Sequence, residues 1–331
     1  MQRLLNLIVL TACILFAGCQ SKKKISWNDA ISKPLKQEIK IKNDRVLQSL
    51  AENKPSDLKK IFSDTLIKQT AEGFNDGVSK MHESVSTKDY TVLDEYFVEN
   101  ISTGFRDTVS KNDSEKRAYK VTFEVLSKES YVSILLHDTP ENQLLILCIY
   151  GKYNGDWKLE VLRIGRYSIF KRTAPDIYEP AKIFFDQGDL LDAANISSLI
   201  QQTLTPAYPF FHYEKEPEIK EFLKKVLTEA GNAYNLPMSV PAIKSTPQIF
   251  NIRLLPLKEG IFPVVTYITK FNLRDSSSIK KENDALQLII GNLFHGIEKN
   301  NKYIFFQAYH ETPGIEKAGD HIEFIMKGRV K

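Results

Sequence analysis

The sequence predicts an α+β protein in which two domains are joined by a helical connector. Three observations lead to this fold class. Helix-like spacing of apolar residues comes first, four β-rich segments follow in succession after residue 118, and helical and β-rich stretches then alternate to the end. A chain of 331 residues is long enough for about two domains, and its 42% hydrophobic content is ordinary for a globular protein.

The first residues, MQRLLNLIVLTACILFAGC, read as an export signal. Arg3 precedes an apolar run from Leu4 to Phe16, which is shorter than the roughly 20 residues that would span a bilayer. The run ends in FAGC, residues 16–19, which resembles the lipobox of bacterial lipoproteins, although Phe16 stands where leucine is usual. This resemblance implies a signal peptide over residues 1–18, cleavage by signal peptidase II and acylation of Cys19. An ordinary export signal with an unmodified Cys19 is the alternative.

A basic tether is expected over residues 19–43. From Gln20 to Arg45 the chain has eight basic and three acidic residues, whereas its whole net charge is only +4. Lysines beside a lipid anchor favour an anionic membrane surface by about 1 kcal/mol each; a solvated spacer is the other interpretation. Some lipoproteins carry acidic residues directly after the cysteine for surface export. QSKKK differs from these and indicates retention facing the periplasm. No nucleic-acid partner is expected, because the basic excess is confined to this stretch.

The cysteine content agrees with an exported chain that has no internal disulfide. Cys13 lies in the signal and Cys19 at the anchor, which leaves Cys148 in the apolar run LLILCIY. We therefore expect Cys148 to be a small core residue with a raised pKa rather than a catalytic thiol.

Residues 44–174 are expected to form the first domain, beginning with helices. The apolar residues of DLKKIFSDTLIKQTAEGF, residues 57–74, fall near helical spacing, and YTVLDEYFV, residues 90–98, is expected to be a second, short helix.

Four β-rich segments follow, at residues 119–128, 130–138, 142–153 and 156–170. Turn signals separate them, and Asn154-Gly155 is the strongest because both residues tolerate the positive φ of a tight hairpin. The segments predict a four-stranded antiparallel meander. Helices followed by such a meander resemble the NTF2-like (cystatin-like) fold over about residues 44–172. The resemblance leaves an enzyme, a ligand-binding pocket and an association module all open.

The connector, residues 175–238, is expected to be helical. AKIFFDQGDLLDAANISSLIQQTLTP, residues 181–206, resembles one tetratricopeptide unit, with Gly188 in the turn and Ala193 at the helix contact. Only one unit is visible, so an αα-hairpin is favoured over a peptide-binding groove. EPEIKEFLKKVLTEAGNAYNLP predicts a third helix, and TPAYPFFHY, residues 205–213, is interpreted as a linker whose rings pack, with a pocket or partner surface as the alternative.

Residues 239–331 predict a C-terminal ββαββ module. Two strands meet at Lys258-Glu259-Gly260, a helix spans KENDALQLIIGNLFHGIEK, and KYIFFQAYHE and HIEFIMKGRV supply two more strands. We expect a small antiparallel sheet with one helix on one face.

Common catalytic and nucleotide-binding motifs are absent from the sequence, and no cofactor or metal is expected. The nearest approach to a metal site pairs His310-Glu311 with His321-Glu323, which are interpreted as polar strand ends. Asp186, Asp189 and Asp192 lie three residues apart. Asp189 is interpreted as a helix N-cap and the other two as solvated residues, with cation binding as the alternative.

These patterns favour a binding or adaptor module over an enzyme. Its partners would be the membrane, through the lipid anchor, and an envelope protein or a small ligand. The alternative is an envelope enzyme with its site on the concave face of the NTF2-like sheet. The candidate ligand-binding residues there are Tyr150, Tyr153, Trp157 and Tyr167. Titratable groups inside that concavity would favour the enzyme, and a filled apolar interior would favour the binding module.

Overall fold

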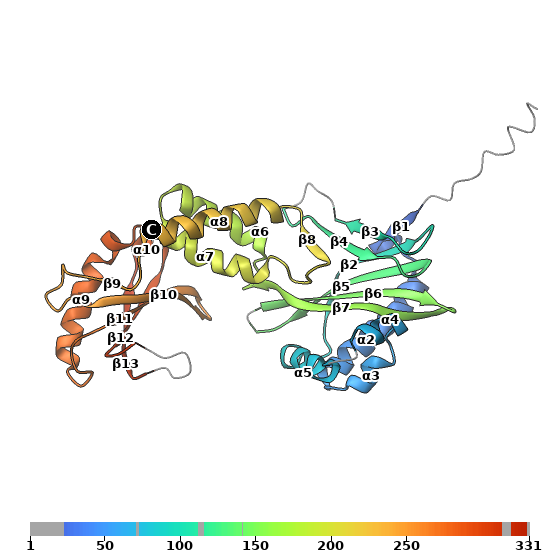
Figure 1. Ribbon diagram of the computed structural model, residues 1–331, viewed down its shortest axis with the longest axis horizontal. Helices are drawn as coiled ribbons and strands as arrows, with labels where there is room; N and C mark the ends of the chain where they lie inside the picture. Colours follow the sequence, from blue (N-terminus) through green and yellow to red (C-terminus); the bar gives the residue numbers. More distant parts are fainter. Residues whose placement is uncertain (1–22, 71–72, 112–115, 141, 313–318, 330–331) are drawn as a thin grey trace, which may run out of the picture. The chain divides into compact units, whose positions relative to one another are not determined.

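The computed structural model describes residues 23–70, 73–111, 116–140, 142–312 and 319–329 (Figure 1). Over these residues the chain has helices and three mostly antiparallel sheets, which confirms the α+β class. The predicted signal peptide and Cys19 lie outside them. Among the described helices, none combines the length and the apolar composition that a bilayer crossing requires.

Contacts group the residues into two units, each made of several segments. The first unit comprises residues 1–108, 122–135 and 147–162, and the second comprises residues 109–121, 136–146 and 163–331. Several strands therefore contribute residues to both units.

A five-stranded sheet, in the order β1-β2-β5-β6-β7, is the framework of the first unit (Figure 1). Its strands are β1 (Lys24–Trp27), β2 (Thr91–Glu99), β5 (Glu129–Asp138), β6 (Asn142–Tyr153) and β7 (Asp156–Ile169). Asn154 and Gly155 have φ values of 50° and 83°, so the predicted tight hairpin between β6 and β7 is confirmed.

Helix α2 (Lys33–Ala51) packs against this sheet through one face. Its buried residues recur at helical spacing and include Ile39, Asn43, Leu47 and Leu50. Asn43 fixes the contact, because its Oδ1 accepts a hydrogen bond from Tyr150 Oη (2.8 Å) and its Nδ2 donates to Ser133 Oγ (3.2 Å).

Two expectations for the start of the chain are corrected. The expected tether, residues 19–43, overlaps β1 and the first half of α2, and the burial of Ile39 and Asn43 makes this part of the folded unit. The helix expected at residues 90–98 is strand β2, because β1 pairs with it over Lys24↔Glu99 to Trp27↔Tyr96. This partner lies about 70 residues earlier in the chain, so local spacing does not reveal it.

Residues 55–84 form three short helices, α3 (Pro55–Lys59), α4 (Asp64–Gln69) and α5 (Phe74–Ser84), and η1 (Asn28–Ala30) is a single turn before α2. The continuous helix expected from residue 57 is interrupted because Phe62 forms a bridge with Leu159 of β7. Ser63 then begins α4 by accepting a hydrogen bond from Leu66 N.

The four expected meander segments are strands, but they do not form one sheet. β4 (Tyr119–Glu124) lies between β3 (Arg106–Ser110) and β8 (Phe211–Tyr213) in a separate three-stranded sheet. Tyr119 pairs with Tyr213 and stacks on Phe211, with ring centroids 4.7 Å apart. The segment interpreted as a linker, residues 205–213, therefore ends in strand β8, which pairs with β4 in this separate sheet.

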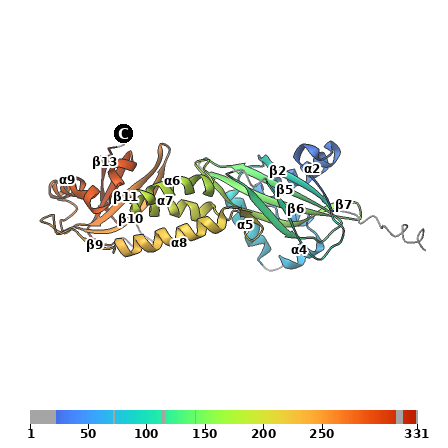
Figure 2. The same ribbon diagram turned by 90° about the horizontal axis from the view of Figure 1, so that it is seen from above.

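Three helices open the remainder of the second unit and run side by side (Figure 2): α6 (Ala174–Asp186), α7 (Leu190–Thr203) and α8 (Glu216–Ala233). Thr173 and Asp176 form a capping box at the start of α6. Gly188, with φ of 78°, makes the turn, and the fully buried Ala181 and Ala193 let α6 and α7 approach closely. The predicted αα-hairpin and third helix are confirmed as elements.

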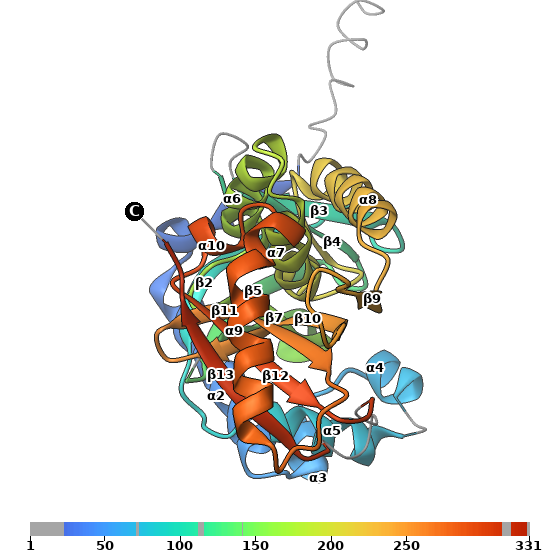
Figure 3. The same ribbon diagram turned by 90° about the vertical axis from the view of Figure 1, so that its left-hand side faces the viewer.

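The C-terminal sheet has the order β13-β12-β11-β10-β9 and is covered by α9 (Ser276–Leu293) (Figure 3). Its strands are β9 (Met238–Ser239), β10 (Gln248–Leu257), β11 (Gly260–Ile268), β12 (Tyr303–Tyr309) and β13 (His321–Lys327), and α10 (Ile297–Asn300) follows α9. β11 and β12 are parallel, because the α9 segment returns the chain to the end of the sheet where β11 began. The wholly antiparallel sheet expected here is therefore wrong.

Candidate functional site

A buried polar cluster joins the turn between α6 and α7 to helix α10. Asp189 and Asp192 are 3% and 6% exposed. The Asn300 amide bridges them, donating to Asp189 Oδ2 (2.8 Å) and to Asp192 Oδ2 (2.9 Å), while Asn301 Nδ2 donates to Asp192 Oδ1 (2.8 Å). His295 Nδ1 lies 2.6 Å from Asp189 Oδ1.

This cluster corrects the interpretation of the aspartates. Asp189 occupies the N-cap position of α7, but its side chain makes no capping hydrogen bond there, and neither Asp189 nor Asp192 is solvated. Burial raises the pKa of Asp192, and the amides of Asn300 and Asn301 act in the opposite direction. Both carboxylates are engaged by amides, which makes the cluster a structural joint rather than an open cation site.

Gly296 permits this joint. Its φ is 89°, and a Cβ atom built on it would lie 2.4 Å from Asp189 Cγ. Only glycine therefore allows the start of α10 to approach the Asp189 carboxylate this closely.

A cavity of about 270 Å³ adjoins the cluster within the second unit. We call it the Asn195 pocket. Its walls come from the end of β7, from α6 and α7 and from the β10–β11 hairpin. The apolar lining residues are Ile169, Phe170, Ile177, Phe184, Ile196, Leu199, Leu254 and Ile261, and the polar ones include Arg172, Asp192, Asn195, Asn300 and Asn301.

Asn195 lines this pocket, and one of its side-chain atoms has no hydrogen-bond partner among the described residues. Its Nδ2 atom is buried and makes no hydrogen bond to the described residues. A buried donor without an acceptor costs about 1–3 kcal/mol. Apolar walls with a few polar groups suit a small amphipathic ligand, although the volume lies near the lower end of the roughly 300–1,000 Å³ typical of ligand sites.

The aromatic residues predicted to bind a ligand are mostly core residues. Tyr150 and Trp157 are fully buried, and Trp157 packs edge to face against Phe97 and Tyr131. Tyr167 is 3% exposed and belongs to the second unit, whereas the other three residues belong to the first. Cys148 is fully buried, which confirms its interpretation as a core residue, and burial raises the pKa of its thiol to about 12.

Tyr153 contacts a buried titratable group, the carboxyl of Glu160. Tyr153 Oη donates to Glu160 Oε1 over 2.5 Å. Glu160 is 5% exposed, and its Oε2 has no partner among the described residues. Burial raises the pKa of Glu160 to about 7; the Tyr153 hydrogen bond lowers it and the nearby Glu124 raises it. Sequence reasoning missed Glu160. The sequence feature that could have pointed to it is Gly151, a glycine inside strand β6 two residues before Tyr153. A Cβ atom at this position would lie 2.0 Å from Glu160 Oε1, so the glycine leaves room for the carboxyl group.

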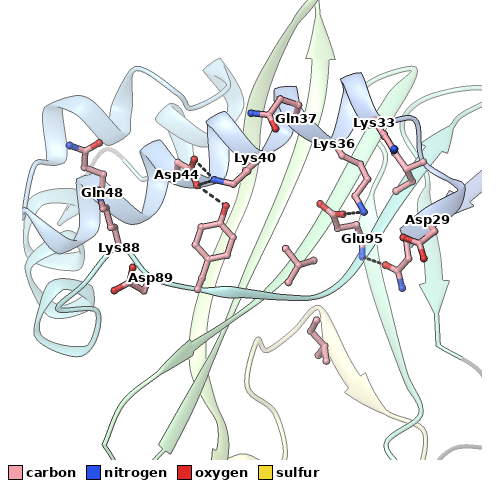
Figure 4. Close-up of a pocket in the computed structure, with 15 residues that line it drawn as sticks. Asp29, Lys33, Lys36, Gln37, Lys40, Asp44, Gln48, Lys88, Asp89 and Glu95 are labelled. Atoms are coloured by element: carbon pink, nitrogen blue, oxygen red, sulfur yellow. Dashed lines mark hydrogen bonds and ion pairs between the residues drawn. The ribbon is translucent and has the colours of Figure 1, made fainter.

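A wide groove of about 1390 Å³ lies in the first unit between α2 and the residues leading into β2 (Figure 4). Its lining has four basic and four acidic residues, and two pairs of them are in contact: Lys36 Nζ lies 3.1 Å from Glu95 Oε2, and Lys40 Nζ lies 2.7 Å from Asp44 Oδ2. Tyr90 Oη also donates to Asp44 Oδ1 (2.8 Å). A groove whose charges are balanced internally shows no preference for a ligand of either sign.

The residues His310, Glu311, His321 and Glu323 do not converge on a metal. His321 stacks on Tyr309, and His310 Nδ1 is 3.2 Å from the carbonyl oxygen of Phe271. Glu323 Oε2 accepts from Gln307 Nε2 (3.1 Å). Within the described ranges, no group of three His, Cys, Asp or Glu side chains could hold a metal ion.

Comparisons of the chain with protein-family models, with curated proteins and with solved structures find no match. The geometry of the chain's own residues therefore carries the functional argument.

Proposed function

We propose that this protein is a lipoprotein of the bacterial cell envelope, anchored through acylated Cys19 and facing the periplasm. Its folded part acts as a non-enzymatic binding module whose ligand occupies the Asn195 pocket. The observation that carries the binding role is this pocket, whose walls are mostly apolar and include Asn195, a residue with a buried Nδ2 atom that makes no hydrogen bond to the described residues. The signal-like run before FAGC supports the anchor.

Two resemblances at the level of the fold are part of the proposal. We propose that the first domain is NTF2-like, which the packing of α2 against a sheet containing the β5-β6-β7 meander supports. The order β10-β11-α9-β12-β13 supports a ββαββ module at the C-terminus. Neither proposal assigns a ligand, because folds of this kind serve several functions.

Blocking the pocket tests the binding role. Protein extracted from its native envelope with a mild detergent would be examined by native mass spectrometry for a small molecule that co-purifies. In Ile196→Trp the added ring fills the pocket, so we expect the bound mass to disappear. Ile183→Trp is the matched control, because Ile183 is on α6 and 54% exposed. A bound mass that survives Ile196→Trp, or wild-type protein without any bound mass, contradicts the pocket assignment.

An envelope enzyme is the second candidate, and the Glu160–Tyr153 pair is the observation that favours it. A carboxyl group with a pKa of about 7 is suited to proton transfer near neutrality. Its 5% exposure keeps it from contact with a substrate in this conformation, which favours binding over catalysis. Incubation with an envelope metabolite extract tests the alternative: turnover by wild type that is lost in Glu160→Gln would establish an enzyme.

A further inference from the structure

The edge strand β1 presents two exposed apolar side chains on one face. Ile25 is 45% exposed and Trp27 is 50% exposed, and residues two apart on a strand point to the same side. Their partners on β2, Val98 and Tyr96, are buried, so the exposure is confined to the edge of the sheet. Among the described strands, β1 pairs only with β2.

The proposed anchor lies close to these side chains along the chain. Cys19 and Ile25 are six residues apart, which an extended chain spans in at most about 20 Å. An acylated Cys19 would therefore hold Ile25 and Trp27 within reach of the lipid headgroups. Tryptophan is favoured at this boundary because its ring is apolar and its N–H is polar.

The charges around β1 suit an anionic surface. Lys22, Lys23 and Lys24 directly precede Ile25. Lys24 is 72% exposed and pairs with Glu99 over 3.1 Å, and Lys23 pairs with Asp107 over 2.5 Å. An exposed ion pair contributes at most about 1 kcal/mol, so Lys24 can exchange Glu99 for a lipid phosphate at little cost.

We infer that β1 is a membrane-docking edge: Ile25 and Trp27 enter the headgroup region of an anionic phospholipid surface while Lys23 and Lys24 contact its phosphates. This inference rests on the proposed lipid anchor. It adds a second attachment that fixes which part of the first unit faces the lipid, which an acyl chain alone cannot do.

Tryptophan fluorescence offers a direct test, because the chain has two tryptophans and the other, Trp157, is fully buried. Acylated protein would be reconstituted into vesicles of phosphatidylethanolamine and phosphatidylglycerol, with plain or brominated acyl chains. We expect brominated lipid to quench Trp27 and to leave Trp157 emitting. In Trp27→Phe the quenched component should vanish. Ile25→Glu should weaken quenching, whereas Leu288→Glu, at a 78% exposed position of α9, should not.

Three outcomes overturn the inference, and they are distinguishable. Mass spectrometry that finds no acyl chain on Cys19 removes the anchor and the docking edge together. Acylated protein with equal emission in plain and brominated vesicles removes the docking edge alone. Absent quenching, together with dimers in detergent that Ile25→Glu returns to monomers, would show that the edge pairs with a second copy of the chain instead.

Discussion

Glu160 is a buried residue whose charge state should affect stability. Its pKa of about 7 in the folded protein lies above the ordinary value of 4.5. The folded state therefore binds the proton more tightly than the unfolded state does. The stabilisation of the folded state by this proton is fully present below about pH 4.5 and is lost as the pH rises through about 7. Each unit of pKa difference corresponds to about 1.4 kcal/mol, so a loss of the order of 3 kcal/mol is expected for this group.

Glu160→Gln should remove this pH dependence, because an amide of similar shape stays neutral. We expect the variant to be more stable than wild type at pH 8 and nearly equal to it at pH 4.5. Urea unfolding followed by Trp157 fluorescence would measure both. Glu83→Gln, which changes an exposed carboxyl of α5, is the control and should follow wild type. Parallel pH profiles for wild type and Glu160→Gln would refute the assignment.

The candidate site shows why residue-scale prediction succeeded only in part. The sequence marked Asp189 and Asp192 as notable, but their partners Asn300 and Asn301 are more than 100 residues away. Only the folding of α10 against the α6–α7 turn brings them together. Likewise, the aromatic character of Tyr150 is visible in the sequence, whereas the acceptor for its buried hydroxyl is Asn43 of α2, 107 residues earlier.

At the scale of elements, the β6–β7 hairpin depends on Gly155. Its φ of 83° is unfavourable for a residue with a Cβ, so Gly155→Ala should cost about 1 kcal/mol. Gly155→Asn should cost less, because asparagine tolerates this conformation better. Gly231 lies inside helix α8, where glycine is unfavourable and an added Cβ would meet nothing within 4 Å. Gly231→Ala should therefore stabilise the protein by about 0.5–1 kcal/mol.

Thermal unfolding of these three variants beside wild type would measure their relative stabilities. Equal effects of Gly155→Ala and Gly155→Asn would mean that backbone strain is not what the turn glycine relieves. A lower midpoint for Gly231→Ala would contradict the open surroundings of that helix position.

Element types followed from local pattern wherever the stabilising contacts are local. The Asn154-Gly155 turn and the Gly188 turn were predictable because a positive φ is a property of the residue itself. Strand β2 was not predictable in this way, because its valines and aromatic residues also fit a short helix. Its strand conformation depends on pairing with β1, which is distant in the sequence. The parallel pairing of β11 with β12 also depends on the path of the chain through α9, which no strand sequence contains.

At the scale of the whole molecule, the second unit is assembled from distant segments. Residues 109–121 and 136–146 belong to it together with residues 163–331. β8 obtains its neighbour from the first of these segments, where Tyr119 stacks on Phe211 and pairs with Tyr213. The contacts therefore divide the chain into interleaved segments, whereas the boundary expected near residue 174 is a single point along the sequence.

This interleaving predicts that residues 163–331 are unstable when expressed alone. Without β4, strand β8 loses its partner, and Phe211 and Tyr213, which are 0% and 1% exposed in the whole protein, would be uncovered. We expect the fragment to bind an apolar dye such as anilinonaphthalene sulfonate and to unfold at lower urea than the whole chain. Adding the soluble peptide 106–124, which contains β3 and β4, should reduce dye binding, whereas a scrambled peptide should not. A fragment that unfolds as cooperatively as the whole chain and excludes the dye would mean that β4 is dispensable to the second unit.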